Sequence, residues 1–274
     1  MPYPLNNLAY GLRYRLSELT TPVERYELQI AAGDVSICPP KLQHIDKIYD
    51  EYDFESQNGK LFISKNIRKY VPSIYERNTL VTARKSTLLS HLDEPGLKSE
   101  AFSHFLFQAE VICMEDCIIS KPFINTLSKM AGITTTYIHM SCHSCCNYID
   151  NFGELLIAFP KVNGIQWNAY IDKSWIAKVQ GHSQLDVLCF SVGNYQFEPF
   201  DINEFVTFVK TRRQGFEMRI MVIDNEKKFE SYFLELKRIL DQQLTPLVNP
   251  WFKPSNCTYV VIWFYERPCG WTVS

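Results

Sequence analysis

Residues 186–223 read DVLCFSVGNYQFEPFDINEFVTFVKTRRQGFEMRIMVI, and this stretch decides the fold. It begins with a strand-like run, Asp186–Val192, and ends with a second one, Phe216–Ile223, because Val, Ile and Phe favour strands. The segment between them, Ile202–Arg213, is helix-like. Asp201 directly precedes this helix and can cap its free amides, and Gly215 follows it as a stop. A strand, a helix and a further strand predict neighbouring strands of one parallel sheet.

The same alternation recurs about every 25–30 residues from residue 105 onward. Further strands are expected at Ala109–Cys113, Thr134–Met140, Val162–Tyr170 and Tyr259–Tyr265. Further helices are expected at Pro122–Met130, Phe152–Phe159, Lys173–Gln180 and Lys228–Leu244. The pattern is less regular over residues 41–100, where the Asn58-Gly59 turn predicts a strand at Lys60–Ile63. A helix over Ser64–Tyr70 is expected to follow this strand.

Two architectures fit an α/β chain (α+β overall) with this rhythm. A doubly wound sheet carries helices on both faces, whereas a leucine-rich-repeat-like solenoid has one strand and one helix in each unit. Polar residues interrupt the strands, as Gln166 does between Ile165 and Trp167. This partial alternation indicates that one face of the sheet is wet. Since no Gly-rich phosphate loop follows any strand, the pattern favours the curved, leucine-rich-repeat-like sheet.

Composition limits the classes of function. The chain of 274 residues is 46% hydrophobic, which is typical of a folded protein with one or two domains. Its net charge of -2 argues against an obligate partnership with nucleic acid or an anionic membrane. Neither a membrane-spanning run nor a signal peptide is evident, and the number of cysteines, nine, is odd. We therefore expect reduced thiols and a cytoplasmic or nuclear location.

Cysteines provide the sharpest chemical signal. Cys142 and Cys145 form a Cys-x-x-Cys pair, and Cys113 and Cys117 precede them, so together they are a candidate zinc cluster. The competing interpretation is that these are buried free thiols, because no second Cys-x-x-Cys pair is present. The second interpretation is preferred, so no cofactor and no metal are expected.

Other polar groups have simple structural explanations. No Gly-x-Ser-x-Gly elbow occurs and the histidines are scattered, so no catalytic residue is identified and the chain is expected not to be an enzyme. A turn accounts for the acidic pair Glu115-Asp116 at a strand end. Lys210, Arg212 and Arg213 end a helix, where cations complement the helix dipole, and this explanation is preferred to nucleic-acid binding.

The N-terminal residues contain a leucine pattern of their own. Leu5, Leu8, Leu12, Leu16 and Leu19 recur at spacings of three and four, which places them on one face of a helical period. A Thr-Thr-Pro break then precedes a second short amphipathic segment. Helices this short cannot form a core alone. They must lie against the rest of the chain or against another protein.

This N-terminal pattern resembles a divergent F-box of the kind found in the large nematode F-box families. The positions that match are Pro4, Leu5, Leu8, Leu12, Leu16, Leu19, Pro22 and Leu28. The resemblance implies a three-helix unit that docks on a Skp-type adaptor within a cullin ubiquitin ligase. Nematode F-box proteins often carry a repeat-like C-terminal domain, so the strand–helix rhythm agrees with the resemblance.

Together these observations predict three regions: an F-box-like unit at 1–40, a connecting region at 41–104 and a leucine-rich-repeat-like domain at 105–274. The resemblance implies a non-catalytic substrate receptor that binds the adaptor through its N-terminal helices and an unknown protein target through its repeats. Two alternatives stay open. In the first, the chain is a solenoid-like interaction module whose N-terminal leucines cap its own sheet. In the second, it is a zinc-stabilised binding module.

Overall fold

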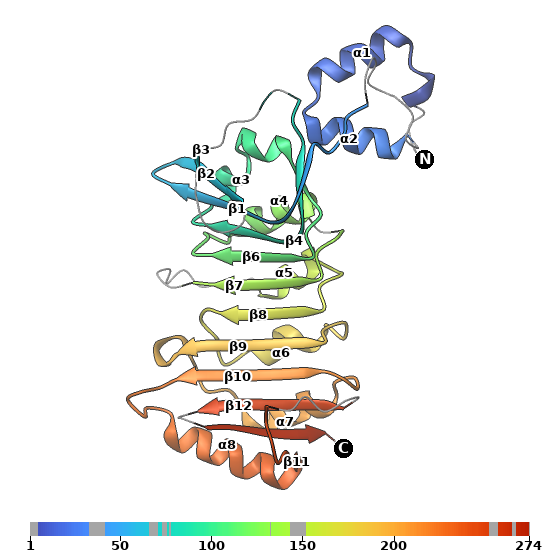
Figure 1. Ribbon diagram of the computed structural model, residues 1–274. Coiled ribbons are helices and arrows are strands. Elements are labelled where there is room, and N and C mark those ends of the chain that lie inside the picture. The colour runs from blue at the N-terminus through green and yellow to red at the C-terminus, as the bar shows by residue number, and fades with distance from the viewer. Residues whose placement is uncertain are drawn as a thin grey trace.

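The structure is a computed structural model that describes residues 5–32, 42–65, 71–72, 76, 78–131, 133–142, 152–251, 257–264 and 267–273. The described residues form eight α-helices and one open sheet of thirteen strands (Figure 1). The chain is therefore α/β, as predicted. Among these residues no helix combines the length and the apolar character that crossing a membrane requires.

A run of parallel strands that follow one another in chain order forms the middle of the sheet. They are β4 (Val81–Ser90), β6 (Val111–Glu115), β7 (Tyr137–Ser141), β8 (Gly164–Asn168), β9 (Val187–Gly193), β10 (Glu217–Ile223) and β12 (Thr258–Phe264). A short strand, β5 (Phe105–Phe107), pairs with the beginning of β4. All six strands predicted after residue 105 are confirmed, each within three residues at either end.

Additional strands extend the sheet at each end. At the N-terminal end, β1 (Lys47–Gln57) runs parallel to β4, and β2 (Lys60–Lys65) and β3 (Val71–Pro72) follow. At the C-terminal end, β13 (Arg267–Val273) pairs antiparallel with β12, and β11 (Thr245–Pro246) lies beyond it. The sheet thus continues without a break through the boundary that we placed at residue 104.

The β1–β2 hairpin confirms the predicted turn. Asn58 and Gly59 both have positive φ, 51° and 73°, the backbone conformation that a two-residue hairpin loop requires. The expected helix over Ser64–Tyr70 is wrong at its beginning, because Ser64 and Lys65 are the last residues of β2. Residues 66–70 lie outside the described part of the chain.

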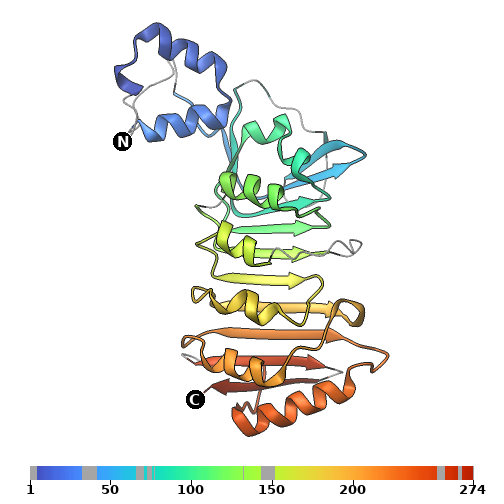
Figure 2. The same ribbon diagram turned by 180° about the vertical axis from the view of Figure 1, so that it is seen from behind.

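Helices connect the parallel strands and lie on one face of the sheet (Figures 1 and 2). They are α4 (Lys121–Ala131), α5 (Phe152–Ala158), α6 (Trp175–Gln180), α7 (Ile202–Lys210) and α8 (Glu230–Gln243), with α3 (Glu94–Leu97) and the 3₁₀ helix η2 (Glu100–His104) between β4 and β5. The five helices predicted after residue 105 are confirmed, and Asp201 Oδ1 accepts a hydrogen bond from the Glu204 amide at 2.8 Å. The described helices leave the other face uncovered, unlike those of a doubly wound sheet.

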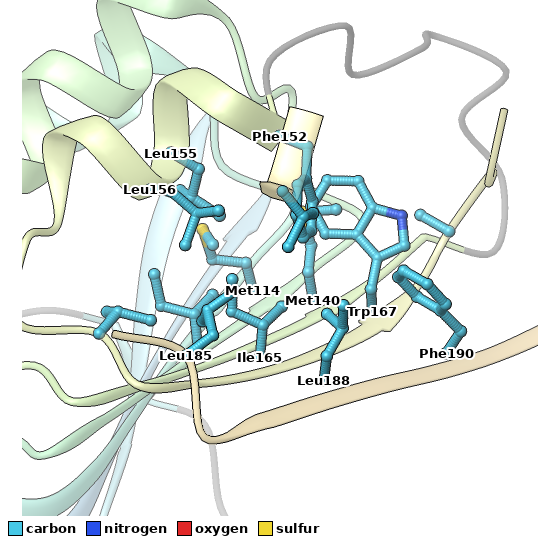
Figure 3. Close-up of a cluster of buried hydrophobic side chains, with 14 of the residues drawn as sticks. Met114, Met140, Phe152, Leu155, Leu156, Ile165, Trp167, Leu185, Leu188 and Phe190 are labelled. Carbon is cyan, nitrogen blue, oxygen red and sulfur yellow. The ribbon is translucent and has the colours of Figure 1, made fainter. Parts of the chain in front are cut away.

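The core lies between the sheet and these helices. In β9, for example, Leu188, Phe190 and Val192 are buried while the residues between them are half-exposed. Figure 3 shows how Phe152, Leu155 and Leu156 of α5 pack onto side chains of the neighbouring strands. Strand side chains alternate between faces, so every second residue points to the helices and the rest to the uncovered face.

The N-terminal helices project beyond the β1–β3 end of the sheet (Figure 1). They are η1 (Leu5–Asn7), α1 (Tyr10–Leu19) and α2 (Pro22–Ala31). A reciprocal capping box starts α2, because Thr21 Oγ1 accepts from the Glu24 amide and Glu24 Oε2 from the Thr21 amide. Polar contacts join α2 to the body: the Gln43 amide donates to Gln29 Oε1 at 3.1 Å.

Candidate functional site

The first candidate surface lies on α1. Leu12 is 61% exposed and Leu19 is 68% exposed, and α1 buries none of its residues. Ile30 of α2 is exposed as well. Isolated exposed leucines are common, but a helix that buries none of its residues has little packing to hold it in place. A partner that covers this surface would stabilise the helix.

The other residues named by the F-box resemblance are less exposed. Leu5, Leu8, Leu16 and Leu28 are half-buried. Pro22 is buried at the first turn of α2. Pro4 lies outside the described residues. Of the leucines that match the F-box pattern, Leu12 and Leu19 are therefore the exposed ones.

The second candidate surface is the sheet face that the helices leave uncovered, which we call the open face. Pairing in register aligns its side chains in rows across the strands. One row consists of Asp53, Leu88, Cys113, His139, Gln166, Cys189, Arg219 and Val261. A second consists of Glu51, Ser86, Val111, Tyr137, Gly164, Val187, Glu217 and Tyr259. A third includes Glu55, Ser90, Glu115, Ser141 and Asn168.

A depression of about 290 Å³ lies on the open face above β1, β4, β6 and β7, and we call it the acidic pocket. Its lining residues are Glu51, Asp53, Ser86, Leu88, Cys113, Met114, Glu115, His139 and Ser141. Three of these described residues carry a carboxylic acid, and none of them is a lysine or an arginine. The sequence-based explanation of Glu115 as a turn residue is incomplete, because it ends β6 and faces this pocket.

Burial sets the protonation of the pocket. It raises the pKa of Asp53 to about 6, with repulsion from Glu51 as the smaller cause. Burial, followed by repulsion from Asp53 and Glu115, raises the pKa of Cys113 to about 11. Burial lowers the pKa of His139, against the opposing attraction of Glu115. At pH 7.5 the thiol and the imidazole are therefore neutral, and the thiol is not activated as a nucleophile.

A polar pocket of about 500 Å³ adjoins it at the carboxyl ends of β7–β10. Its lining includes the amide side chains Asn168, Asn194, Gln196 and Asn225, and it shares Ser141 with the acidic pocket. Asn168 Nδ2 donates to His139 Nε2 at 3.1 Å, which connects the two pockets and requires an uncharged imidazole nitrogen. Gln196 Nε2 donates to the Cys142 carbonyl at 3.1 Å.

The opposite end of the open face is aromatic and electrically balanced. Arg219 forms an ion pair with Glu217 on the same strand, and Tyr259 of β12 lies opposite Glu217 in the strand register. Trp263 of β12 contacts the exposed Trp251 edge-to-face, with ring centroids 5.3 Å apart. Since aromatic side chains dominate protein recognition, this end suits contact with a protein.

The candidate zinc residues are dispersed within the described part of the chain. Cys113 lies on the open face, whereas Cys117 belongs to the hydrophobic core and its Sγ donates to the Leu89 carbonyl at 3.2 Å. Cys142 follows β7, and Cys145 lies outside the described residues. No group of three or more His, Cys, Asp or Glu residues suited to a metal ion occurs among the residues searched.

Sequence reasoning missed the acidic pocket because no strand was assigned to residues 47–57, which form β1. A signal was present: in Glu51-Tyr52-Asp53-Phe54-Glu55, acids alternate with aromatics at the period of a strand. The aromatics face the core, and the acids face the open side.

No protein-family model, no curated protein and no solved structure matches this chain.

Proposed function

We propose that this protein is a non-catalytic substrate receptor of a cullin-type ubiquitin ligase. Its N-terminal helices would bind a Skp-type adaptor in the manner of an F-box, and its open face, similar to that of leucine-rich-repeat proteins, would bind a protein target. The observation that carries the proposal is the exposure of Leu12 and Leu19 on a helix that buries none of its residues.

Helix geometry supports the adaptor surface. Leu12, Leu16 and Leu19 are separated by four and three residues, so they lie along one side of α1. Full burial of a leucine contributes roughly 1.5–3 kcal/mol. A partner that covers Leu12 and Leu19 would gain much of this free energy, because this chain itself leaves both exposed.

The open face supports target binding. It is continuous over the parallel strands, and it offers a charged pocket, amide side chains and an aromatic end. A receptor of this kind acts by position: it holds the target near the conjugating enzyme at a high effective concentration. No residue of the receptor then needs to take part in chemistry. The proposal includes a cytoplasmic or nuclear location, which agrees with reduced cysteines.

Adaptor capture tests the proposal. The full chain is co-expressed with a Skp-type adaptor, as the parent and with Leu12→Asp or Leu19→Asp. We expect the parent to capture the adaptor and each variant to lose at least about tenfold in affinity, because an aspartate in a buried apolar contact is unpaired. Affinity is measured by titrating purified receptor with adaptor.

The matched control is Leu234→Asp, which alters an exposed leucine of α8 at the far end of the molecule. It is expected to bind the adaptor like the parent. A parent that captures no adaptor would refute the ligase link and leave an interaction module. Unfolding of the Leu12→Asp and Leu19→Asp variants would mean that the leucines support the chain's own fold.

A further inference from the structure

Asp53 occupies an unusual position for a charged residue. In β1 its neighbours Tyr52 and Phe54 are fully buried on the helix side, so Asp53 points to the open face. It is nevertheless only 4% exposed. Across the strands it lies opposite Ser64 of β2 and Leu88 of β4. The Asp53 side chain therefore lines the acidic pocket although the residue is almost fully buried.

The Asp53 side chain has no hydrogen-bond or ion-pair partner among the described residues. The adjacent Ser64 Oγ is also buried without a partner. Burying a carboxylate without a partner is costly, and native proteins almost always pair such groups. A buried, unpaired carboxylate that lines a pocket is a candidate binding group.

The charges around Asp53 are of the same sign. Glu51 is on its own strand, and Glu115 of β6 lines the same pocket, while the facing residues of β4 and β2 are uncharged. The nearby lysines are engaged elsewhere: Lys85 Nζ pairs with Asp50 at 2.7 Å, and Lys65 Nζ lies 5.5 Å from the centre of the Tyr49 ring. The pocket thus lacks a compensating cation among the described residues.

We propose that the acidic pocket binds the cationic side chain of a lysine or arginine of the target protein. The charged group would pair with Asp53, flanked by Glu51 and Glu115, and its aliphatic stem would pack on Leu88. The assignment of the cation to a target rests on the proposed function, whereas binding of a cationic peptide is testable without it. A metal ion is a poor fit, since no suitable group of three ligands occurs in the described residues.

Peptide binding by the purified full chain tests this proposal. The probes are fluorescein-labelled octapeptides of alternating Gly and Lys or Gly and Arg, with a Gly and Gln octapeptide as the neutral control, measured by anisotropy at pH 7.5. We expect one of the cationic peptides to bind and Asp53→Asn to weaken it by about tenfold or more, as for the loss of a hydrogen bond to a charged group. The Glu51→Gln/Glu115→Gln double variant is expected to weaken it as well.

The matched control is Glu204→Gln, which removes one negative charge from the helix side of the sheet. The affinity of this variant for the cationic peptide should differ from that of the parent by less than about twofold. If Glu204→Gln and Asp53→Asn weaken peptide binding equally, the effect is due to net charge alone and the proposal is overturned. A parent that binds no cationic peptide would overturn it as well. Competition with spermidine tests whether the bound cation belongs to a protein side chain or to a free polyamine. Displacement of the peptide by an equal concentration of spermidine would overturn the assignment to a protein side chain.

Stability supplies a second readout. At pH 7.5 Asp53 is charged in the folded and unfolded chain, and burial penalises the folded state. Asp53→Asn should therefore raise the melting temperature by about 2–4 °C at pH 7.5. This gain should vanish at pH 4, where the folded state already holds the proton. If the Asp53 carboxylate were purely structural, replacing it would instead destabilise the protein.

Acid should release the cationic peptide. Between pH 7.5 and pH 5 Asp53 gains a proton, since its pKa is about 6. This loss of negative charge opposes cation binding, so the affinity of the parent for the peptide falls with falling pH. The decrease should be shallower in Asp53→Asn; an identical pH profile in parent and variant would contradict the role of Asp53.

Adaptor capture and peptide binding fail independently. Asp53→Asn leaves α1 intact, so it should capture the adaptor like the parent, and Leu12→Asp should bind the cationic peptide like the parent. Loss of adaptor capture alone therefore overturns the ligase link, and absence of peptide binding alone overturns the role of the acidic pocket.

Discussion

Replacing Trp167 by alanine is expected to lower the free energy of unfolding by about 3–5 kcal/mol. Trp167 on β8 is only 3% exposed, and its ring contacts Phe152 of α5 edge-to-face, with centroids 4.6 Å apart (Figure 3). Its indole Nε1 also donates to the Tyr170 carbonyl at 3.1 Å. The substitution leaves a cavity where a strand, a helix and a loop meet, and it leaves that carbonyl without its partner.

Urea denaturation monitored by circular dichroism measures this effect. The matched control is Trp251→Ala, because Trp251 is 71% exposed, and its cost should stay below about 1 kcal/mol. Trp167→Phe, which keeps an aromatic ring but loses the donor, should fall between the two. A loss below about 1 kcal/mol for Trp167→Ala would show that this part of the core does not pack as described.

Arg212→Ala is expected to cost about 2–4 kcal/mol, because several backbone acceptors lose their partner together. Arg212 follows α7 in the chain, yet its guanidinium donates to three carbonyls at the end of α6: His182 at 2.9 Å, Val179 at 3.1 Å and Gln180 at 3.4 Å. It also lies over the Phe208 ring, 4.1 Å from its centre. The Arg212 side chain therefore donates hydrogen bonds to the free carbonyls at the C-terminus of α6 and also covers the Phe208 ring of α7.

Arg213→Ala is the matched control for this prediction. Arg213 is more exposed and donates to the Gln184 carbonyl at 2.9 Å and to Asp186, so we expect a cost of about 1 kcal/mol or less. Arg212→Lys keeps the charge but loses the fork that reaches several carbonyls, and should be intermediate. Equal denaturation midpoints for the alanine variants at 212 and 213 would contradict the bridging role of Arg212.

Arg212 illustrates why local rules identified a charge but not its function. The rule that cations complement the C-terminus of a helix led us to assign Lys210, Arg212 and Arg213 to the end of α7. In the structure Arg212 caps the neighbouring helix α6, and Lys210 Nζ donates to Gln243 at the end of α8. Adjacent helices lie close enough that a long side chain can reach the next helix, and sequence spacing carries no information on that distance.

The acidic pocket shows the same limit. The alternation of acids and aromatics at 51–55 is local and visible in the sequence, but Glu115 and His139 enter the pocket only because β6 and β7 are aligned with β1 and β4. Register depends on the packing of the buried face across strands that are far apart in sequence. The desolvation that raises the pKa of Asp53 likewise exists only when those strands are assembled.

The sequence alone determined the order and type of the elements after residue 105, the N-terminal helices and the alternation that marks a wet sheet face. These features follow from periodicity, capping and turn residues, which act over a few neighbouring positions. Only the tertiary structure decided which leucines of α1 are exposed, which acids meet in one pocket and which helix end Arg212 caps. Those outcomes depend on distances and burial between segments that are separated in the chain, and no local pattern encodes them.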